Sequence, residues 1–118
     1  MRKALYLSAP VVLWAGLIFY LSSIPDLSSG LEMDYVLRKS AHVTEYAVLA
    51  LLLWRAWGDG GRPLRQVFLL SFAAAVLYAV SDEWHQHFVP GRGPSAADVA
   101  LDVAAALAAC GLRAWRSS

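Results

Sequence analysis

Charged residues are scarce in this sequence, and their scarcity argues against a soluble domain. Only 16% of the 118 residues are Asp, Glu, Lys or Arg, whereas 58% are hydrophobic and the mean hydropathy is +0.49. An ordinary soluble domain carries about 25% charged residues. The deficit predicts a bilayer environment, and the length predicts a single domain over residues 1–118.

Cysteine and excess positive charge are also nearly absent. The single cysteine, Cys110, rules out an internal disulfide, and we expect it to pack as a small apolar residue. The net charge of +1 provides no broad basic surface, so nucleic acid is not expected as a partner. The sequence contains neither HExxH nor a pair of CxxC motifs, so a metal site has no established signature here.

Four apolar stretches predict an all-α fold, a bundle of four transmembrane helices at about residues 4–22, 35–57, 65–87 and 96–115. Each stretch is close to the roughly 20 residues that cross a hydrocarbon core. The first is uncharged from Ala4 to Leu21, which exceeds the roughly 7–15 residues of a signal-peptide core. We therefore expect an uncleaved anchor at the N-terminus.

The distribution of basic residues predicts the orientation of this bundle. With four crossings, both termini and the loop near residue 60 share one side of the membrane. That side holds Arg2, Lys3, Arg55, Arg62, Arg65, Arg113 and Arg116. The other side holds only Arg38, Lys39 and Arg92. The positive-inside rule then places both termini in the cytoplasm.

The second predicted helix carries a polar face. Lys39, His42, Glu45 and Tyr46 follow helical spacing and so stack along one side. Ionisable groups inside a membrane are candidates for function because they are expensive to keep there. In the alternative, Lys39 extends to the interface and Glu45 pairs with His42 or Lys39 to hold the helix in place.

The third predicted helix ends in a second polar cluster, Asp82, Glu83, His85 and Gln86. Its carboxylates and imidazole suit either general acid–base chemistry or a divalent metal ion. The candidate catalytic residues are His42, Glu45, Asp82, Glu83 and His85. If a metal is the cofactor, the candidate ligands are His42, Glu45, Asp82, His85 and Asp102.

Arg92 and two aspartates complete the predicted site. Arg92 lies in a turn rich in Gly and Pro, where it and Lys39 suit a phosphate or carboxylate, or where it forms a salt bridge to Asp98 or Glu83. Asp98 is also placed to cap the fourth helix, whereas Asp102 lies deeper and needs a basic partner, a proton or a cation. The candidate substrate-binding residues are Lys39, Tyr46, Gln86, Arg92 and Asp98.

The motifs Lys39-x-x-His42-x-x-Glu45-Tyr46 and Ser81-Asp82-Glu83-x-x-Gln86-x-x-Val89-Pro90-Gly91-Arg92, followed by Asp98, resemble the VanZ-like family. This is a family of small bacterial integral membrane proteins named for a teicoplanin-resistance factor. The resemblance implies a multi-pass protein of the bacterial inner membrane, acting in the cell envelope, with a link to glycopeptide resistance. The chain departs from the family at Asp102, where members often carry Asn, and at Ala105 and Ala109, where they carry Gly.

Three functions fit a polar site at the outer-leaflet ends of the second to fourth helices. The first is hydrolysis or transfer on a lipid-linked or anionic headgroup. The second is non-catalytic binding or shielding of such a headgroup, alone or as a subunit of an envelope complex. Proton-coupled transport ranks last, because four helices give little room for alternating access unless the protein forms an oligomer. The expected partner in the first two is a membrane lipid or a lipid-linked envelope precursor.

Overall fold

The computed structural model describes residues 2–23, 32–89 and 96–117. That part of the chain contains four helices and no strand, namely α1 (Arg2–Ser22), α2 (Glu32–Gly58), α3 (Leu64–Gln86) and α4 (Ala96–Ser117). The all-α class is confirmed. The helix ends differ by at most three residues from the predicted ranges.

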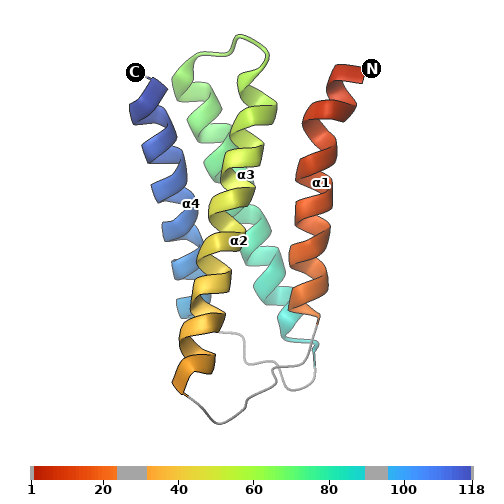
Figure 1. Ribbon diagram of the computed structural model, residues 1–118, viewed down its shortest axis with the longest axis vertical. Helices are drawn as coiled ribbons and strands as arrows, with labels where there is room; N and C mark the ends of the chain where they lie inside the picture. The colour runs from red at the N-terminus through yellow and green to blue at the C-terminus, as the bar shows by residue number, and fades with distance from the viewer. Residues whose placement is uncertain (1, 24–31, 90–95, 118) are drawn as a thin grey trace.

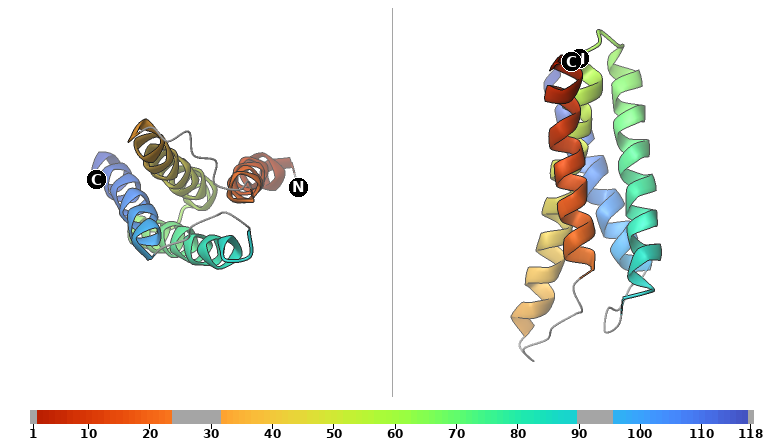
Figure 2. Two further views of the ribbon diagram at one scale, coloured as in Figure 1. Left: turned by 90° about the horizontal axis from the view of Figure 1, so that it is seen from below. Right: turned by 90° about the vertical axis from the view of Figure 1, so that its right-hand side faces the viewer.

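The four helices lie lengthwise beside one another in a body of 48 × 30 × 20 Å (Figure 1). Both termini and the turn between α2 and α3 lie at one end, which we call the terminal end; the opposite end is the distal end. Seen along the bundle, α2, α3 and α4 form a close group, while α1 stands on the far side from α4 (Figure 2). The second half of α3 and the first halves of α2 and α4 therefore meet toward the distal end.

Small residues allow the helices to approach closely. Ser71, Ala75 and Ala79 recur every four residues along α3 and are almost fully buried, as are Ala106 and Cys110 of α4. Small side chains at such spacing let two backbones pack at short range. The burial of Cys110 is the packing role that its sequence context predicts.

The outer surface of the bundle is apolar. In α1 only Ile18 and Ser22 are buried, whereas large side chains such as Leu13 remain about three-quarters exposed at 74%. Soluble monomers rarely expose contiguous apolar surface of this kind. By length and composition, α1 and α3 are apolar enough to cross a membrane, and α2 and α4 do not meet the same criterion.

The turn between α2 and α3 is short and is held by hydrogen bonds to both helices. Gly61 adopts a φ of +72°, a left-handed conformation that favours glycine. Arg62 Nη1 donates to the carbonyl oxygen of Trp57 at 2.9 Å, and the carbonyl of Pro63 accepts from the amides of Gln66 and Val67 in the first turn of α3. This turn fixes the terminal ends of α2 and α3 against each other.

Candidate functional site

Seven polar side chains from α2, α3 and α4 line up between these helices toward the distal end. We call them the polar row: Lys39, His42, Tyr46, Asp82, Gln86, Asp98 and Asp102. Five of the seven are buried, and the other two, Lys39 and Asp98, are partly buried. The row is thus an internal structure of the bundle and not a solvated helix face.

Two charge pairs join α2 to α4. Lys39 forms an ion pair and hydrogen bond with Asp98, and His42 Nδ1 lies 3.0 Å from Asp102 Oδ1. The side chains of His42 and Asp102 are only 6% and 3% exposed. α2 and α4 run in the same direction (Figure 1). Lys39 and His42 are about one helical turn apart on α2, and Asp98 and Asp102 are about one turn apart on α4, so the two pairs form side by side.

Asp82 and Gln86 of α3 connect the row to α2 and, through Ser22, to α1. Tyr46, which is fully buried, donates from its hydroxyl to Asp82 Oδ2 at 3.1 Å. Gln86 Nε2 lies one turn further along α3, 3.5 Å from Asp82 Oδ2, and donates to Ser22 Oγ at 3.3 Å. Asp82 therefore receives donors from two helices on a single carboxylate oxygen.

The other oxygen of Asp82 has no hydrogen-bond partner among the described residues, and neither has Nδ1 of His85, although both atoms are buried. Both residues line a cavity of about 380 Å³ between α1 and α3, which we call the aromatic pocket. Its remaining walls are Phe19, Tyr78, Ser81, Trp84 and Phe88. Buried polar groups without partners are rare in proteins, which makes these two atoms unusual.

His85 faces α1 and not the other histidine of the predicted site. Its ring stacks on Phe19 with centroids 4.3 Å apart, and its Nε2 is 3.5 Å from Ser23 Oγ. His42 instead contacts α4 through Asp102. The structure therefore divides the predicted metal ligands, and across residues 2–23, 32–89 and 96–117 no three His, Cys, Asp or Glu side chains are grouped to hold a metal ion.

The remaining predicted residues lie at the margin of the row. Glu45 is half-buried, and its backbone carbonyl accepts a hydrogen bond of 2.8 Å from the indole of Trp14. Glu83 is half-buried and makes no side-chain hydrogen bond or ion pair within the described chain. Arg92 lies outside the described residues. Lys39 and His42 each pair with an aspartate of α4, and the pairing of Glu45 with either of them stays a prediction.

Sequence reasoning missed the contribution of α1. Ser22 accepts from Gln86, and the hydroxyl of Tyr78 donates to the carbonyl of Ala15. Trp14 donates from its indole nitrogen to the backbone of α2. Of these, only the burial of a serine near the end of an apolar helix has a sequence signal, a polar residue where lipid would disfavour it.

Six of the seven residues of the polar row belong to the two sequence motifs and the Asp98 that follows them, as do Ser81 and Asp82 of the aromatic pocket. A family model described as VanZ/LLP1 matches residues 7–115, which is most of the chain. The chain belongs to the VanZ/LLP1 family. No curated protein and no solved structure matches it significantly.

In this VanZ/LLP1 protein Asp102 connects α4 to α2 through its contact with His42. The resemblance implies Asn at this position in many members, and an Asn side-chain oxygen can accept the same hydrogen bond from His42. Either residue can thus join α4 to α2. Ala105 and Ala109, where the resemblance implies glycine, line a groove that α2 and α4 share.

Proposed function

We propose that all four helices of this VanZ/LLP1 protein cross the bacterial inner membrane, with both termini in the cytoplasm. The charges that make α2 and α4 less apolar than α1 and α3 include Lys39, Asp98 and Asp102, and these pair across the α2–α4 contact. Pairing lowers the cost of placing such groups in a bilayer. Both termini lie at one end of the bundle, where most of the basic residues are found (Figure 1).

We further propose that the polar row and the aromatic pocket bind the headgroup of a membrane lipid or lipid-linked envelope precursor in the outer leaflet. The observation that supports this is the buried carboxylate of Asp82, which uses one oxygen for Tyr46 and Gln86 and leaves the other without a partner beside the pocket. A hydroxyl or amine of a headgroup supplies the missing donor. Aromatic walls accommodate its apolar parts and attract an ammonium group.

Binding of defined lipids to Asp82→Asn tests this proposal. Detergent-purified protein is titrated with phosphatidylethanolamine, phosphatidylglycerol and a polyprenyl-diphosphate-linked cell-wall precursor, and bound lipid is counted by native mass spectrometry. We expect at least one of the three to bind, and the variant to bind it about tenfold less tightly, since a hydrogen bond to a charged group contributes about 1.5–3 kcal/mol. Glu83→Gln, which removes a neighbouring carboxylate that lines neither the aromatic pocket nor the groove at the terminal end, is the matched control. Equal affinities for the two variants would reject the proposal.

A catalytic role is the second candidate, and the His42–Asp102 pair favours it. A carboxylate that binds one imidazole nitrogen fixes the ring and prepares the other nitrogen as a general base. Hydrolysis or transfer would then release a headgroup fragment detectable by mass spectrometry. Product formed by the parent protein and lost in His42→Gln would establish catalysis; binding without product would leave recognition as the function.

The implied link to glycopeptide resistance provides a cellular readout of the same site. Expression in a teicoplanin-sensitive bacterium should raise the inhibitory concentration, and Asp82→Asn should remove the increase at equal membrane abundance. Protection that persists in Asp82→Asn would separate resistance from the polar row.

A further inference from the structure

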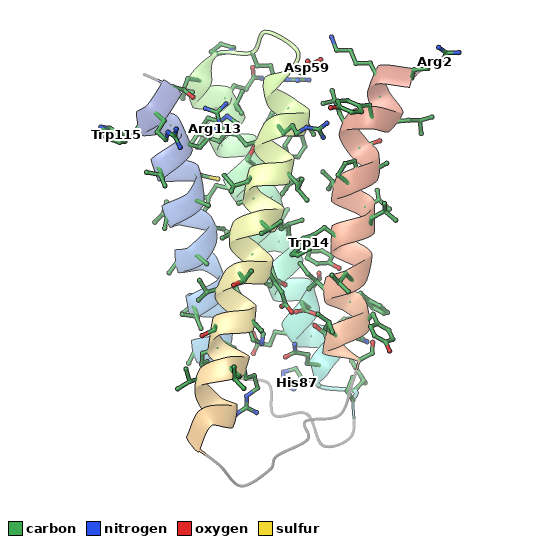
Figure 3. All side chains as sticks on the ribbon, in the orientation of Figure 1. Arg2, Trp14, Asp59, His87, Arg113 and Trp115 are labelled. Atoms are coloured by element: carbon green, nitrogen blue, oxygen red, sulfur yellow. The ribbon has the colours of Figure 1, made fainter. Side chains whose placement is uncertain are left out.

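A groove of about 1160 Å³ runs among the helices from the middle of the bundle to the terminal end, and Asp82 does not line it. Four arginines line it, one from α2, one from the α2–α3 turn and two from α4: Arg55, Arg62, Arg113 and Arg116. Much of the remaining wall is apolar, with contributions from Val43, Ala47, Leu51, Ala105, Ala108 and Leu112. In Figure 3, Arg113 points from α4 toward the other helices while Trp115 points away from the bundle.

The guanidinium groups in this groove contact neutral partners. Arg55 donates to the carbonyl of Tyr6 at 3.3 Å and stacks 4.3 Å from its ring. Arg113 lies over the ring of Trp54 at 5.9 Å and donates to Ser117. These contacts orient the arginines without neutralising them.

The groove has little negative charge of its own. Asp59 is the one carboxylate among its lining residues, and it forms an ion pair with Lys3 at 3.0 Å. Within the described ranges, none of the four arginines pairs with a carboxylate. Several unneutralised cations at the rim of an apolar groove attract a ligand that combines an anion with a hydrocarbon chain.

We propose that this groove binds an anionic phospholipid of the cytoplasmic leaflet. The phosphate contacts the arginines, whose planar guanidinium groups bind phosphate through paired hydrogen bonds. One acyl chain follows the apolar wall formed by Ala108 of α4 and Leu51 of α2. Basic pockets between membrane helices on the cytoplasmic side are suited to such headgroups. The proposal rests on the membrane placement proposed above but not on any residue of the polar row.

Charge favours a lipid over a second copy of the chain. In a twofold dimer the same patch meets itself, so packing through the groove would bring two sets of arginines together. Like charges facing each other at short range are repulsive. An anionic lipid removes that repulsion and also covers the apolar wall.

The test compares two double variants with equal loss of charge. Arg113→Gln with Arg116→Gln removes two groove arginines, whereas Arg2→Gln with Arg65→Gln removes two basic residues near the same end that do not line the groove. The purified full chain is titrated with dioleoyl phosphatidylglycerol, dioleoyl phosphatidylcholine or inorganic phosphate, and native mass spectrometry measures occupancy and oligomeric state. At about fivefold per basic residue lost, the groove variant should bind phosphatidylglycerol about thirtyfold more weakly, and the control should match the parent.

Each of several results would overturn the inference. These are equal binding of the zwitterionic and anionic lipids, equal loss in both double variants, inorganic phosphate competing as well as the lipid, or a dimer lost only in the groove variant. If the groove variant does not fold, Ala108→Phe decides, because a bulky side chain on the apolar wall should exclude the lipid while all arginines remain. Asp82→Asn should leave phosphatidylglycerol bound in the groove, so failure of the outer site and failure of this one are distinguishable.

Discussion

Removing the carboxylate of Asp102 should destabilise the bundle more than removing any exposed carboxylate. The side chains of His42 and Asp102 are 6% and 3% exposed, and their closest atoms are 3.0 Å apart. Asp102→Ala leaves a buried imidazole without this partner. Breaking one side of a buried charged pair in a soluble protein costs about 3–5 kcal/mol. Hydrogen bonds between membrane helices contribute less, about 0.6 kcal/mol on average and up to about 1.7 kcal/mol.

The burial of the His42–Asp102 pair favours the larger of these two energies. Both groups are enclosed by α2 and α4 and do not face lipid, so neither can recruit a new partner without separating the helices. We therefore expect Asp102→Ala to lower the free energy of unfolding by about 3 kcal/mol. Asp102→Asn keeps an acceptor for His42 and should cost about 1 kcal/mol.

A double-mutant cycle isolates the interaction itself. Unfolding of His42→Phe, Asp102→Ala and the double variant is followed by far-ultraviolet circular dichroism in mixed micelles of increasing denaturing-detergent content. The coupling energy should be about 1.5 kcal/mol or more, near the upper limit for membrane helices. Asp59→Ala, whose exposed ion pair with Lys3 contributes at most about 1 kcal/mol, is the control. A coupling energy below about 0.5 kcal/mol would refute the reasoning, because the pair would then not hold α2 to α4.

Three further substitutions test other parts of the fold. Tyr46→Phe removes the 3.1 Å hydrogen bond to Asp82 and should lower the free energy of unfolding by about 1–3 kcal/mol in the same assay. An unchanged free energy of unfolding would show that this hydrogen bond does not stabilise the fold. Lys39→Asp combined with Asp98→Lys should restore most of the stability that either single substitution loses. If the double variant stays as unstable as the single ones, other neighbours of each residue determine which charge is tolerated there. Gly61→Ala should lower the midpoint of thermal unfolding through a loss of about 1 kcal/mol, since the φ of +72° strains any other residue, and an unchanged midpoint would show that the turn adjusts.

The sequence allowed the helices and the polar faces to be predicted, but not the pairing between helices. Long apolar runs separated by stretches rich in Gly, Pro and Ser identify the helices. Spacing along α2 correctly places Lys39, His42 and Tyr46 on one side. Spacing cannot give the rotation or the relative height of a neighbouring helix. The assignment of Lys39 to Asp98 and His42 to Asp102 depends on that rotation and height, and it therefore appears only in the folded bundle.

The cavities are harder still to foresee. The aromatic pocket lies where α1 meets α3 through Phe19 and His85, and apart from Ser22 little in the apolar sequence of α1 indicates which of its sides does so. Weak periodicity in an apolar helix is the expected consequence of lipid contact on most of its circumference. For the same reason the roles of Trp14 and Ser22 depend on tertiary packing.

The two ends of the bundle differ in charge balance, and this difference constrains what each can bind. At the distal end Lys39 and His42 already meet carboxylates, so an anion arriving there must compete with Asp98 for the lysine. The group left unsatisfied is an acceptor, Asp82 Oδ1, which calls for a donor on the ligand. At the terminal end the arginines contact neutral groups, so an anion meets no internal competitor. On the two binding proposals above, a ligand of the distal site is selected chiefly by its hydroxyl or amine groups, and a lipid of the groove at the terminal end by its phosphate.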